Sequence, residues 1–521
     1  MTAFISLIRF YGEITPFDVA LLYRDGTGRL AEDTVPIILP HQVAYSLFRT
    51  DRFDDVLAGT VEHRREFWLR HRHSPWFLAH PGRAYAEAHP EHCIGVRLWG
   101  DDAVALKNAS VYAVSFGSVF CTRLASLLSR YLAFAVAVHK YVNLEPLWRA
   151  LAWSLSILVS DDCLMPSHDW LGEALTGDRA QKAGESICGS YRFLLCLFTG
   201  DLKFLVETFK FIHSYNSGDE FCWACYARKV PSVLSGFIFS ADAPCFLTTR
   251  SHLLYMSETG NGLAVCTLPG FHLGIILWDL MHTVHLGVLP VLLGAAFVIL
   301  LERNHFNGPD GGPWMHRYNV QLQRASDEFV KFCKDNRVSS SQPHFTLGRL
   351  SLSHAKSDPP YFKGKAANNE LVARFLLSIF SHLAHSSHDE HIRLVATCLW
   401  GFVRALDIFK TSGLFLDDRQ RRDLETARKA ALLSHAHLAR DAISNGTQLF
   451  RTIPKHHFCD HIFRAPNGWN FACSWCFADE DFIGRLVRIN RRSVNPHQLM
   501  RRYLVRLHLT FHLRRSSAPQ L

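Results

Sequence analysis

Acidic residues at the ends of apolar runs are the side chains here whose type and position could do chemistry. The run CIGVRLWG (93–100) stops at Asp101 and Asp102, and SYRFLLCLFTG (190–200) stops at Asp201. A carboxylate is costly to bury on a strand, so each Asp is either a cap or turn residue or a metal ligand. If the first and fourth strands are neighbours, Asp101 (or Asp102) and Asp201 reach one spot. They could hold Mg²⁺ there, because this ion prefers oxygen ligands.

A second pair of polar residues interrupts the apolar stretch GFHLGIILWDLMHTVHLGVLPVLL (270–293). Asp279 and His282 are three residues apart, so they would share one face of a helix. Polar residues on such a helix are either core groups with satisfied hydrogen bonds or part of a site. An aspartate and a histidine on the same face favour a site.

Cysteines and histidines offer ligands for a softer metal. Cys222 and Cys225 have C-x-x-C spacing, which fits a structural zinc site or a redox pair. A second C-x-x-C, Cys473 and Cys476, could complete a four-cysteine site. Other residues compete as the remaining ligands: Cys245, His252, Cys266 and His272. One more cluster has metal-binding spacing, although a chain with 30 His will contain such clusters by chance: His456, His457, Asp460 and His461.

The acidic residues 101 and 201 must be positioned by strands. Runs rich in Val, Ala and aromatic residues predict strands over 93–103, 110–120, 131–142 and 190–205, and leucine spacing predicts a helix over 144–162. The order is three strands, a helix and a fourth strand. Further on, residues 276–335 and 370–448 are expected to be helical, with a Ser- and Pro-rich loop at 337–369.

The same apolar stretch raises the question of a membrane. Leu286–Leu301 has 16 residues without a charge, which is short of the roughly 20 that cross a bilayer. It also contains Pro290 and two glycines, so a buried core helix is favoured. The first residues lack the pattern of a secretory signal. Fourteen cysteines in 521 residues are too sparse for a disulfide scaffold, so we expect mostly reduced cysteines.

Positive charge gathers at the C-terminal end. The net charge is +9, and no acidic residue follows Asp481. This segment is either a solvated basic tail or an element that contacts phosphates, since Arg matches phosphate geometry. The arginines that we expect to contact DNA are Arg485, Arg488, Arg491, Arg492, Arg501 and Arg502.

Taken in order, these blocks resemble the DDE/D transposases of the CACTA group and the related Kyakuja–Dileera–Zisupton elements. The block LWGDDA resembles the one that supplies the first catalytic Asp, with Asp101 the better match, and LFTGDLKFL resembles the block of the second, Asp201. The closing block PKHHFCDHI…FADEDFIGRL is similar to the one with the third acidic residue, here Glu480. The resemblance spans residues 93–490.

Two further blocks carry the resemblance. The C-x-x-C of Cys222 and Cys225 looks like the zinc-binding start of the family's long insertion. DLMH, Asp279 to His282, resembles the C/D-x-x-H signature. This chain departs from the family in having Ala103 after two aspartates, where an aspartate-glycine turn is usual. It also shows no DNA-binding finger before residue 93, which suggests a truncated or domesticated copy.

The resemblance implies an α/β fold, an RNase H-like mixed sheet core split by a large, mainly α-helical insertion. The expected segments are a mixed and helical region (1–92), the first part of the core (93–215), a cysteine-containing loop region (216–275), the helical insertion (276–450), the closing part of the core (451–490) and an Arg-rich segment (491–521).

The implied activity is cleavage and strand transfer of transposon-end DNA in the nucleus. Asp101, Asp201 and Glu480 would bind Mg²⁺ or Mn²⁺, and His282, oriented by Asp279, would lie beside the scissile phosphate. A structural Zn²⁺ at the C-x-x-C is also expected. DNA is the partner, no membrane is involved, and homo-oligomerisation stays open. The alternatives are a catalytically inactive DNA- or chromatin-binding protein on the same fold and a protein anchored in a membrane through residues 270–301.

Overall fold

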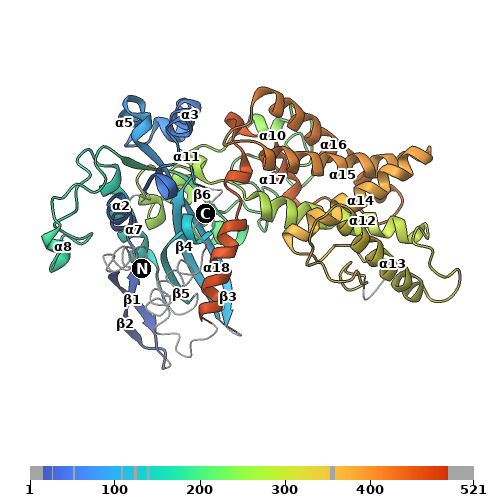
Figure 1. Ribbon diagram of the computed structural model, residues 1–521, viewed down its shortest axis with the longest axis horizontal. Coiled ribbons are helices and arrows are strands. Elements are labelled where there is room, and N and C mark those ends of the chain that lie inside the picture. Colours follow the sequence, from blue (N-terminus) through green and yellow to red (C-terminus); the bar gives the residue numbers. More distant parts are fainter. Residues whose placement is uncertain are drawn as a thin grey trace. The chain divides into compact units, whose positions relative to one another are not determined.

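Two units make up the chain. The computed structural model describes residues 16–490, except residues 26, 51–52, 107–108, 122–125, 138–140 and 353–357. The first unit contains residues 1–212, 250–277 and 473–521, and the second contains residues 213–249 and 278–472. Figure 1 labels the elements of both. The boundaries between the units therefore cut two of the expected segments. The loop region 216–275 is divided after residue 249, and the closing segment 451–490 is divided after residue 472.

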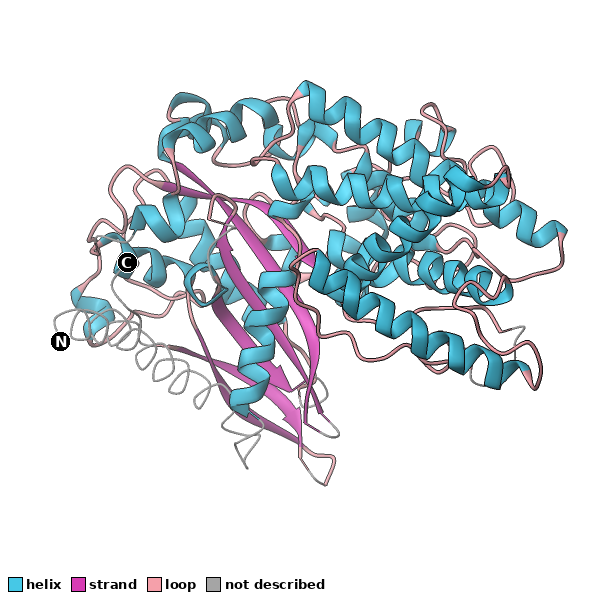
Figure 2. Cartoon of the chain, turned by 45° about the vertical axis from the view of Figure 1, so that its right-hand side comes forward, coloured by secondary structure: helices cyan, strands magenta, loops and turns pink. Residues whose placement is uncertain are grey.

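The first unit is built on a four-stranded mixed sheet with the order β5-β4-β3-β6 (Figure 2). β3 (Cys93–Leu106), β4 (Ala109–Ser118) and β5 (Tyr131–Ala137) are successive antiparallel neighbours, whereas β6 (Arg192–Gly200) is parallel to β3. The helix α7 (Glu145–Val159) connects β5 to β6. The predicted order of three strands, a helix and a strand is confirmed. The first and fourth of these strands are neighbours, which was the condition for bringing Asp101 or Asp102 close to Asp201.

Helices cover both faces of the sheet beside β3 and β6. Trp148 of α7 and Phe204 of α9 (Leu202–Phe209) contact the ring of Phe198 on one face. On the opposite face, Trp99 and Arg97 of β3 donate hydrogen bonds to the first turn of α18 (Phe477–Asn490) and the residue before it. Figure 1 shows α18 alongside β3. Every residue of β6 is buried, as expected for a strand that is covered on both faces.

The other elements of the first unit are short, and two of them, β1 and β2, form an antiparallel hairpin. In chain order they are β1 (Phe17–Arg24), β2 (Leu30–Ile37), α2 (Pro40–Phe48), η1 (Asp54–Ala58), α3 (Val61–His71), α4 (Pro75–Leu78), α5 (Arg83–Ala88), η2 (Pro90–His92), α6 (Ser126–Ser129), α8 (Asp178–Gln181), α11 (His252–Tyr255), η3 (Met256–Gly260), η4 (Ala264–Thr267) and η5 (Leu273–Ile275).

The second unit is helical after an irregular first segment, and the predicted helices over 276–335 and 370–448 are confirmed, apart from short connecting loops. The long helix α15 packs against both α14 and α16 (Figure 1). The helices among its described residues are α10 (Pro244–Leu247), η6 (Met281–Val288), α12 (Leu289–Glu302), α13 (Trp314–Asp335), α14 (Ala366–Ser386), α15 (Glu390–Thr411), α16 (Asp418–Ser444), α17 (Pro454–Phe463), η7 (Pro466–Gly468) and the first residues of η8 (Phe471–Cys473).

The apolar stretch Met281–Glu302 forms η6 and α12 inside the second unit. By length and composition it could cross a membrane, but 94% of its most apolar window is buried within the protein. A Cβ at Gly294 would lie 2.8 Å from backbone atoms of Pro360 and Tyr361, so the glycine allows that loop to pack directly on the helix. This burial agrees with the core-helix interpretation, and the stretch gives only weak support to a membrane span.

Candidate metal centre and acidic residues

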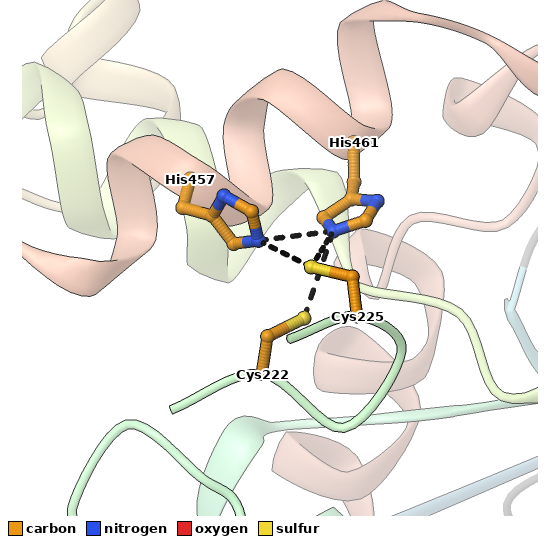
Figure 3. Close-up of side chains that lie close together, drawn as sticks. All are labelled: Cys222, Cys225, His457 and His461. Carbon is orange, nitrogen blue, oxygen red and sulfur yellow. Dashed lines mark hydrogen bonds between the residues drawn. The ribbon is translucent and has the colours of Figure 1, made fainter. Parts of the chain in front are cut away.

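Four side chains of the second unit form a cluster that could hold a metal ion (Figure 3). Cys222 and Cys225 come from an irregular loop, in which the Phe221 amide donates to the Ala227 carbonyl. The two histidines, His457 and His461, are four residues apart on α17 and therefore project from one face of that helix. The sequence offered the C-x-x-C pair and the histidine cluster as separate candidates, and the structure brings them together.

The distances within the cluster are compatible with a tetrahedral zinc site. Cys222 Sγ and Cys225 Sγ both lie 3.6 Å from His461 Nε2, and Cys225 Sγ lies 3.2 Å from His457 Nε2. The two Nε2 atoms are 3.1 Å apart. Around zinc, usual bond lengths place sulfur and nitrogen ligands about 3.6 Å apart and two nitrogens about 3.3 Å apart. The cluster therefore has the dimensions of a closed Cys₂His₂ site.

Neighbouring groups orient these ligands. The Nδ1 atom of His457 hydrogen-bonds to the Gly236 carbonyl over 3.1 Å, which leaves Nε2 for a metal. The ring of Trp278 stacks on His461 with centroids 4.2 Å apart. Cys222, Cys225 and His457 are fully buried. Four protein ligands in a dry surrounding are typical of a structural zinc site and leave no position open for a substrate.

Cys245 is a fifth potential donor at the edge of the cluster. Its thiol hydrogen-bonds with Cys225 and with His457. Burial opposes the charged form of His457, but the hydrogen bonds to Cys225 and Cys245 outweigh it and raise its pKa to about 9.

The other residues that the sequence offered as metal ligands either have different partners or belong to the first unit. His456 stacks on His435 with centroids 4.0 Å apart, and the buried carboxylate of Asp460 pairs with Arg428 over 2.7 Å. Cys473 and Cys476 belong to the first unit. So do His252, Cys266 and His272, and the rings of the two histidines pack on each other.

Asp101 and Asp102 point to opposite faces of β3. Asp102 lies on the α9 face, where its carboxylate pairs with Lys203 over 2.6 Å. Side chains alternate along a strand, so Asp101 lies on the same face as Trp99 and Arg97, which is the face that α18 covers. Asp101 is buried, 7% exposed. The structure thus separates two acids that the sequence left as alternatives.

Asp201 lies directly beyond the last pair of the parallel ladder. Gly100 of β3 pairs with Gly200 of β6, so Asp101, which lies within β3, and Asp201, which follows β6, are at the same level. The expectation that the first strand stops at Asp101 is wrong, because β3 continues through both acids to Leu106 and stays paired with β4. Asp201 is also the N-cap of α9, where its Oδ1 accepts a hydrogen bond of 2.5 Å from the Phe204 amide. A cap role and a ligand role were both open from the sequence, and the structure shows the cap.

Glu480 lies in the first turn of α18, between two acids with other partners. Asp479 is fully buried and pairs with Arg97 at 2.7 Å and Arg130 at 2.5 Å. Asp481 accepts hydrogen bonds from Ser126 and Arg485. Glu480 is half-buried. The partners of Asp479 and Asp481 therefore leave Glu480 as the acid of this turn that is considered as a magnesium ligand.

The three predicted magnesium ligands come from neighbouring elements, but they do not form a cage for a single ion. Among the described residues, the acidic, cysteine and histidine groups whose ligand atoms all lie within 4.8 Å of one another do not include Asp101, Asp201 and Glu480 as a set. Their role as magnesium ligands stays a prediction.

Asp279 and His282 interact, but Asp279 lies just before the helix and does not share a helical face with His282, although the spacing predicted that it would. The carboxylate of Asp279 accepts hydrogen bonds from both the backbone amide and Nδ1 of His282, each 2.7 Å long. These two hydrogen bonds orient the imidazole of His282. Asp279 itself is buried and lies just before η6. Both residues belong to the second unit, whereas the acids at 101, 201 and 480 belong to the first.

The predicted DNA-contacting arginines fall mostly outside the described residues. Arg485 pairs with Asp481 over 2.7 Å, and Arg488 is exposed on α18, where its side chain donates to the Gly484 carbonyl. The others lie beyond residue 490: Arg491, Arg492, Arg501 and Arg502.

No protein-family model matches this sequence, and no curated protein matches it either.

Proposed function

We propose that this protein is a DNA-processing enzyme of the RNase H-like type, a transposase or transposase-derived polynucleotidyl transferase that acts in the nucleus with Mg²⁺ or Mn²⁺. Its second unit would be stabilised by a structural zinc ion. The observation that carries the proposal is the parallel ladder between β3 and β6, whose last pair, Gly100 and Gly200, is followed directly by Asp101 and Asp201 at one level.

The sheet order supports this choice of fold. Three consecutive antiparallel strands, a helix, and a fourth strand parallel to the first are the arrangement that the resemblance to DDE/D transposases implies. The acids at 101 and 201 come from different parts of the chain, and a third acid, Glu480, lies on a helix that packs on β3. Carboxylate oxygens from distant positions are the ligands that Mg²⁺ uses in such sites.

Each residue has a definite part in the proposed chemistry. Bound divalent ions supply activation of the attacking oxygen and stabilisation of the leaving oxygen in phosphodiester transfer. Asp101 and Asp201 would hold them at the end of the sheet, and the Asp479 ion pairs fix the turn of α18 that carries Glu480. Asp279 holds His282 with Nδ1 engaged, so any contact with DNA would use Nε2.

A catalytically inactive DNA-binding protein on the same fold is the second candidate. It is favoured by the N-cap hydrogen bond, which already uses one oxygen of Asp201, and by the lack of a tight three-carboxylate cluster among the described residues. The two candidates differ in whether the protein cuts DNA.

The test is DNA cleavage by the full chain with Mg²⁺ or Mn²⁺, measured as nicking of supercoiled plasmid and as strand joining. Asp201→Asn is the informative variant, because Asn caps a helix as well as Asp does and the substitution removes only the charge. Loss of cleavage with unchanged thermal stability supports the enzyme. DNA binding without cleavage by the wild type supports the inactive binder.

Matched controls exist on the same elements. Asp102→Asn removes an acid from the opposite face of β3, and Asp481→Asn removes one next to Glu480. If Asp102→Asn abolishes cleavage and Asp101→Asn does not, the assignment of the first acid is wrong. Glu480→Gln should match Asp201→Asn, and Asp481→Asn should keep activity.

The zinc proposal is tested by metal analysis of the purified protein. We expect one zinc per chain, and none in Cys222→Ser or His461→Ala, because each removes a ligand of a four-ligand site. Cys333→Ser, in α13, is the control that should keep the metal. A wild-type protein without bound metal, or a Cys222→Ser variant with full zinc content, contradicts the assignment.

A further inference from the structure

Two buried cysteines of the first unit lie against each other. Neither belongs to the candidate metal centre, whose ligands are in the second unit. Cys163 and Cys188 have no exposed surface, and their Sγ atoms are 3.6 Å apart. They stand at the two ends of a segment between α7 and β6 that contains a single short helix, α8. The pair thus brackets a long connection that has little regular structure of its own.

The backbone holds the two thiols in this position. The Ile187 amide donates to the Cys163 carbonyl over 3.0 Å, and the Met165 amide donates to the Glu185 carbonyl over 2.8 Å. These bonds form a short antiparallel ladder at the base of the segment. The contact between the sulfurs is therefore a consequence of paired backbone and does not depend on side-chain rotation alone.

A buried cation lies beside the pair. Arg192, 7% exposed, donates hydrogen bonds to the carbonyls of Gly189, Tyr191 and Asp161. Within the described part of the chain, no carboxylate pairs with this guanidinium. A buried charge without a counter-ion is costly, and a thiolate at Cys163 would supply the missing negative charge.

The two thiols differ in acidity. The hydrogen bond from Cys188 lowers the pKa of the Cys163 thiol, burial opposes this, and the charge of Arg192 adds to the lowering. The same hydrogen bond raises the pKa of Cys188. Arg192 stands beside the pair and the Cys188 thiol donates to the Tyr191 carbonyl over 3.3 Å, so we assign Cys163 as the nucleophile and Cys188 as the partner that resolves it, since the thiolate is the reactive form.

We propose that Cys163 and Cys188 form a redox modification site, at which a peroxide oxidises the two thiols to an intramolecular disulfide. The Cys163 thiolate attacks one oxygen of hydrogen peroxide, the O–O bond breaks, and water and a sulfenic acid at Cys163 result. Cys188 then attacks that sulfur, an S–S bond forms, and a second water leaves. The sum is two thiols and one hydrogen peroxide giving one disulfide and two waters.

The inference does not depend on the proposed DNA chemistry. Disulfides in proteins of reducing compartments are usually transient and redox-sensing, and this one would fasten the segment that leads directly into β6. A dithiol reductant should reverse it. Because both sulfurs are buried, oxidation requires local opening of the segment, so it will proceed more slowly than oxidation of an exposed thiol.

The experiment treats the full chain with hydrogen peroxide, blocks free thiols by alkylation after unfolding, and maps the peptides by mass spectrometry. We expect a crosslinked peptide pair that joins Cys163 to Cys188, and its loss after reduction with dithiothreitol. In Cys188→Ser, Cys163 should stop at the sulfenic acid and be trapped by a 1,3-diketone reagent. Cys333→Ser is the matched control and should leave the crosslink unchanged.

The result that overturns the proposal is clear. If Cys163 and Cys188 both remain alkylated as free thiols under conditions that oxidise the partly exposed Cys266, the pair is not a modification site. Crosslinks of either cysteine to a different partner would overturn it too. The wild-type peptide map decides the question even if Cys188→Ser fails to fold.

Discussion

Replacing Asp479 with asparagine tests how α18 is held against the sheet. The carboxylate pairs with the guanidinium groups of Arg97 and Arg130, and all three side chains are at most 2% exposed. The substitution keeps the shape but leaves two buried cations without an anion. Removing one partner of a buried ion pair costs about 3–5 kcal/mol. Arg97 depends on this partner especially, because its Nε and Nη1 atoms are buried without a hydrogen bond.

The assay is thermal unfolding of the full chain, with hydrogen exchange of the α18 amides as a local readout. A loss of 3–5 kcal/mol should lower Tm by roughly 6–20 °C in a unit of this size. The control is Asp481→Asn, two residues further along the same helix. Its ion pair with Arg485 is 31–41% exposed, so its change in stability should stay below about 1 kcal/mol. Equal stability of the two variants would refute the buried ion triad and the packing of α18 on β3.

Three further predictions concern stability alone. Gly100→Ala should destabilise the first unit by about 1–3 kcal/mol in denaturant unfolding, because the new Cβ would lie 1.8 Å from the Phe204 ring, whereas Gly484→Ala meets no atom within 4 Å and should be neutral. Burial lowers the pKa of His435 to about 4, so the unfolded chain binds this proton more tightly. The free energy of unfolding should fall by roughly 3 kcal/mol as the pH drops from 6.5 to 4, and His435→Phe should reduce that slope. Lys203→Met leaves the Asp102 carboxylate, which is 4% exposed, without its cation and should destabilise the first unit by about 1–3 kcal/mol.

The arrangement of the sheet could be predicted because its strands are marked in the sequence. β6 is buried along its whole length and ends just before Asp201, so its limits follow from the hydrophobic run, whereas β3 begins with its apolar run but continues past the acids to Leu106. A parallel pair of such strands places Asp101 and Asp201 at one level whatever the loops do. The same reasoning could not separate Asp101 from Asp102, because the face of each residue depends on which helix packs on which side.

The completion of the metal cluster could not be predicted. A C-x-x-C is half of a site, and the chain contains 30 histidines that could supply the rest. Cys225 and His457 are 232 residues apart, and only the path of the second unit brings α17 to the cysteine loop. Buried arginines were missed for a related reason. Charged residues are expected at the surface, and nothing in the runs around Arg97 or Arg428 marks them as members of buried ion pairs.

The distance along the chain between the cysteine loop and α17 also determines the order in which the four ligands are synthesised. Cys222 and Cys225 leave the ribosome first, and their histidine partners follow only after the long helices have been made. At the usual 5–20 residues per second, the 232 residues between Cys225 and His457 take roughly 10–50 seconds to synthesise. During that interval the nascent chain carries two thiols without their imidazoles. The four side chains can therefore meet only after the helices between them have been synthesised. Formation of the cluster is thus a late step in the folding of the second unit.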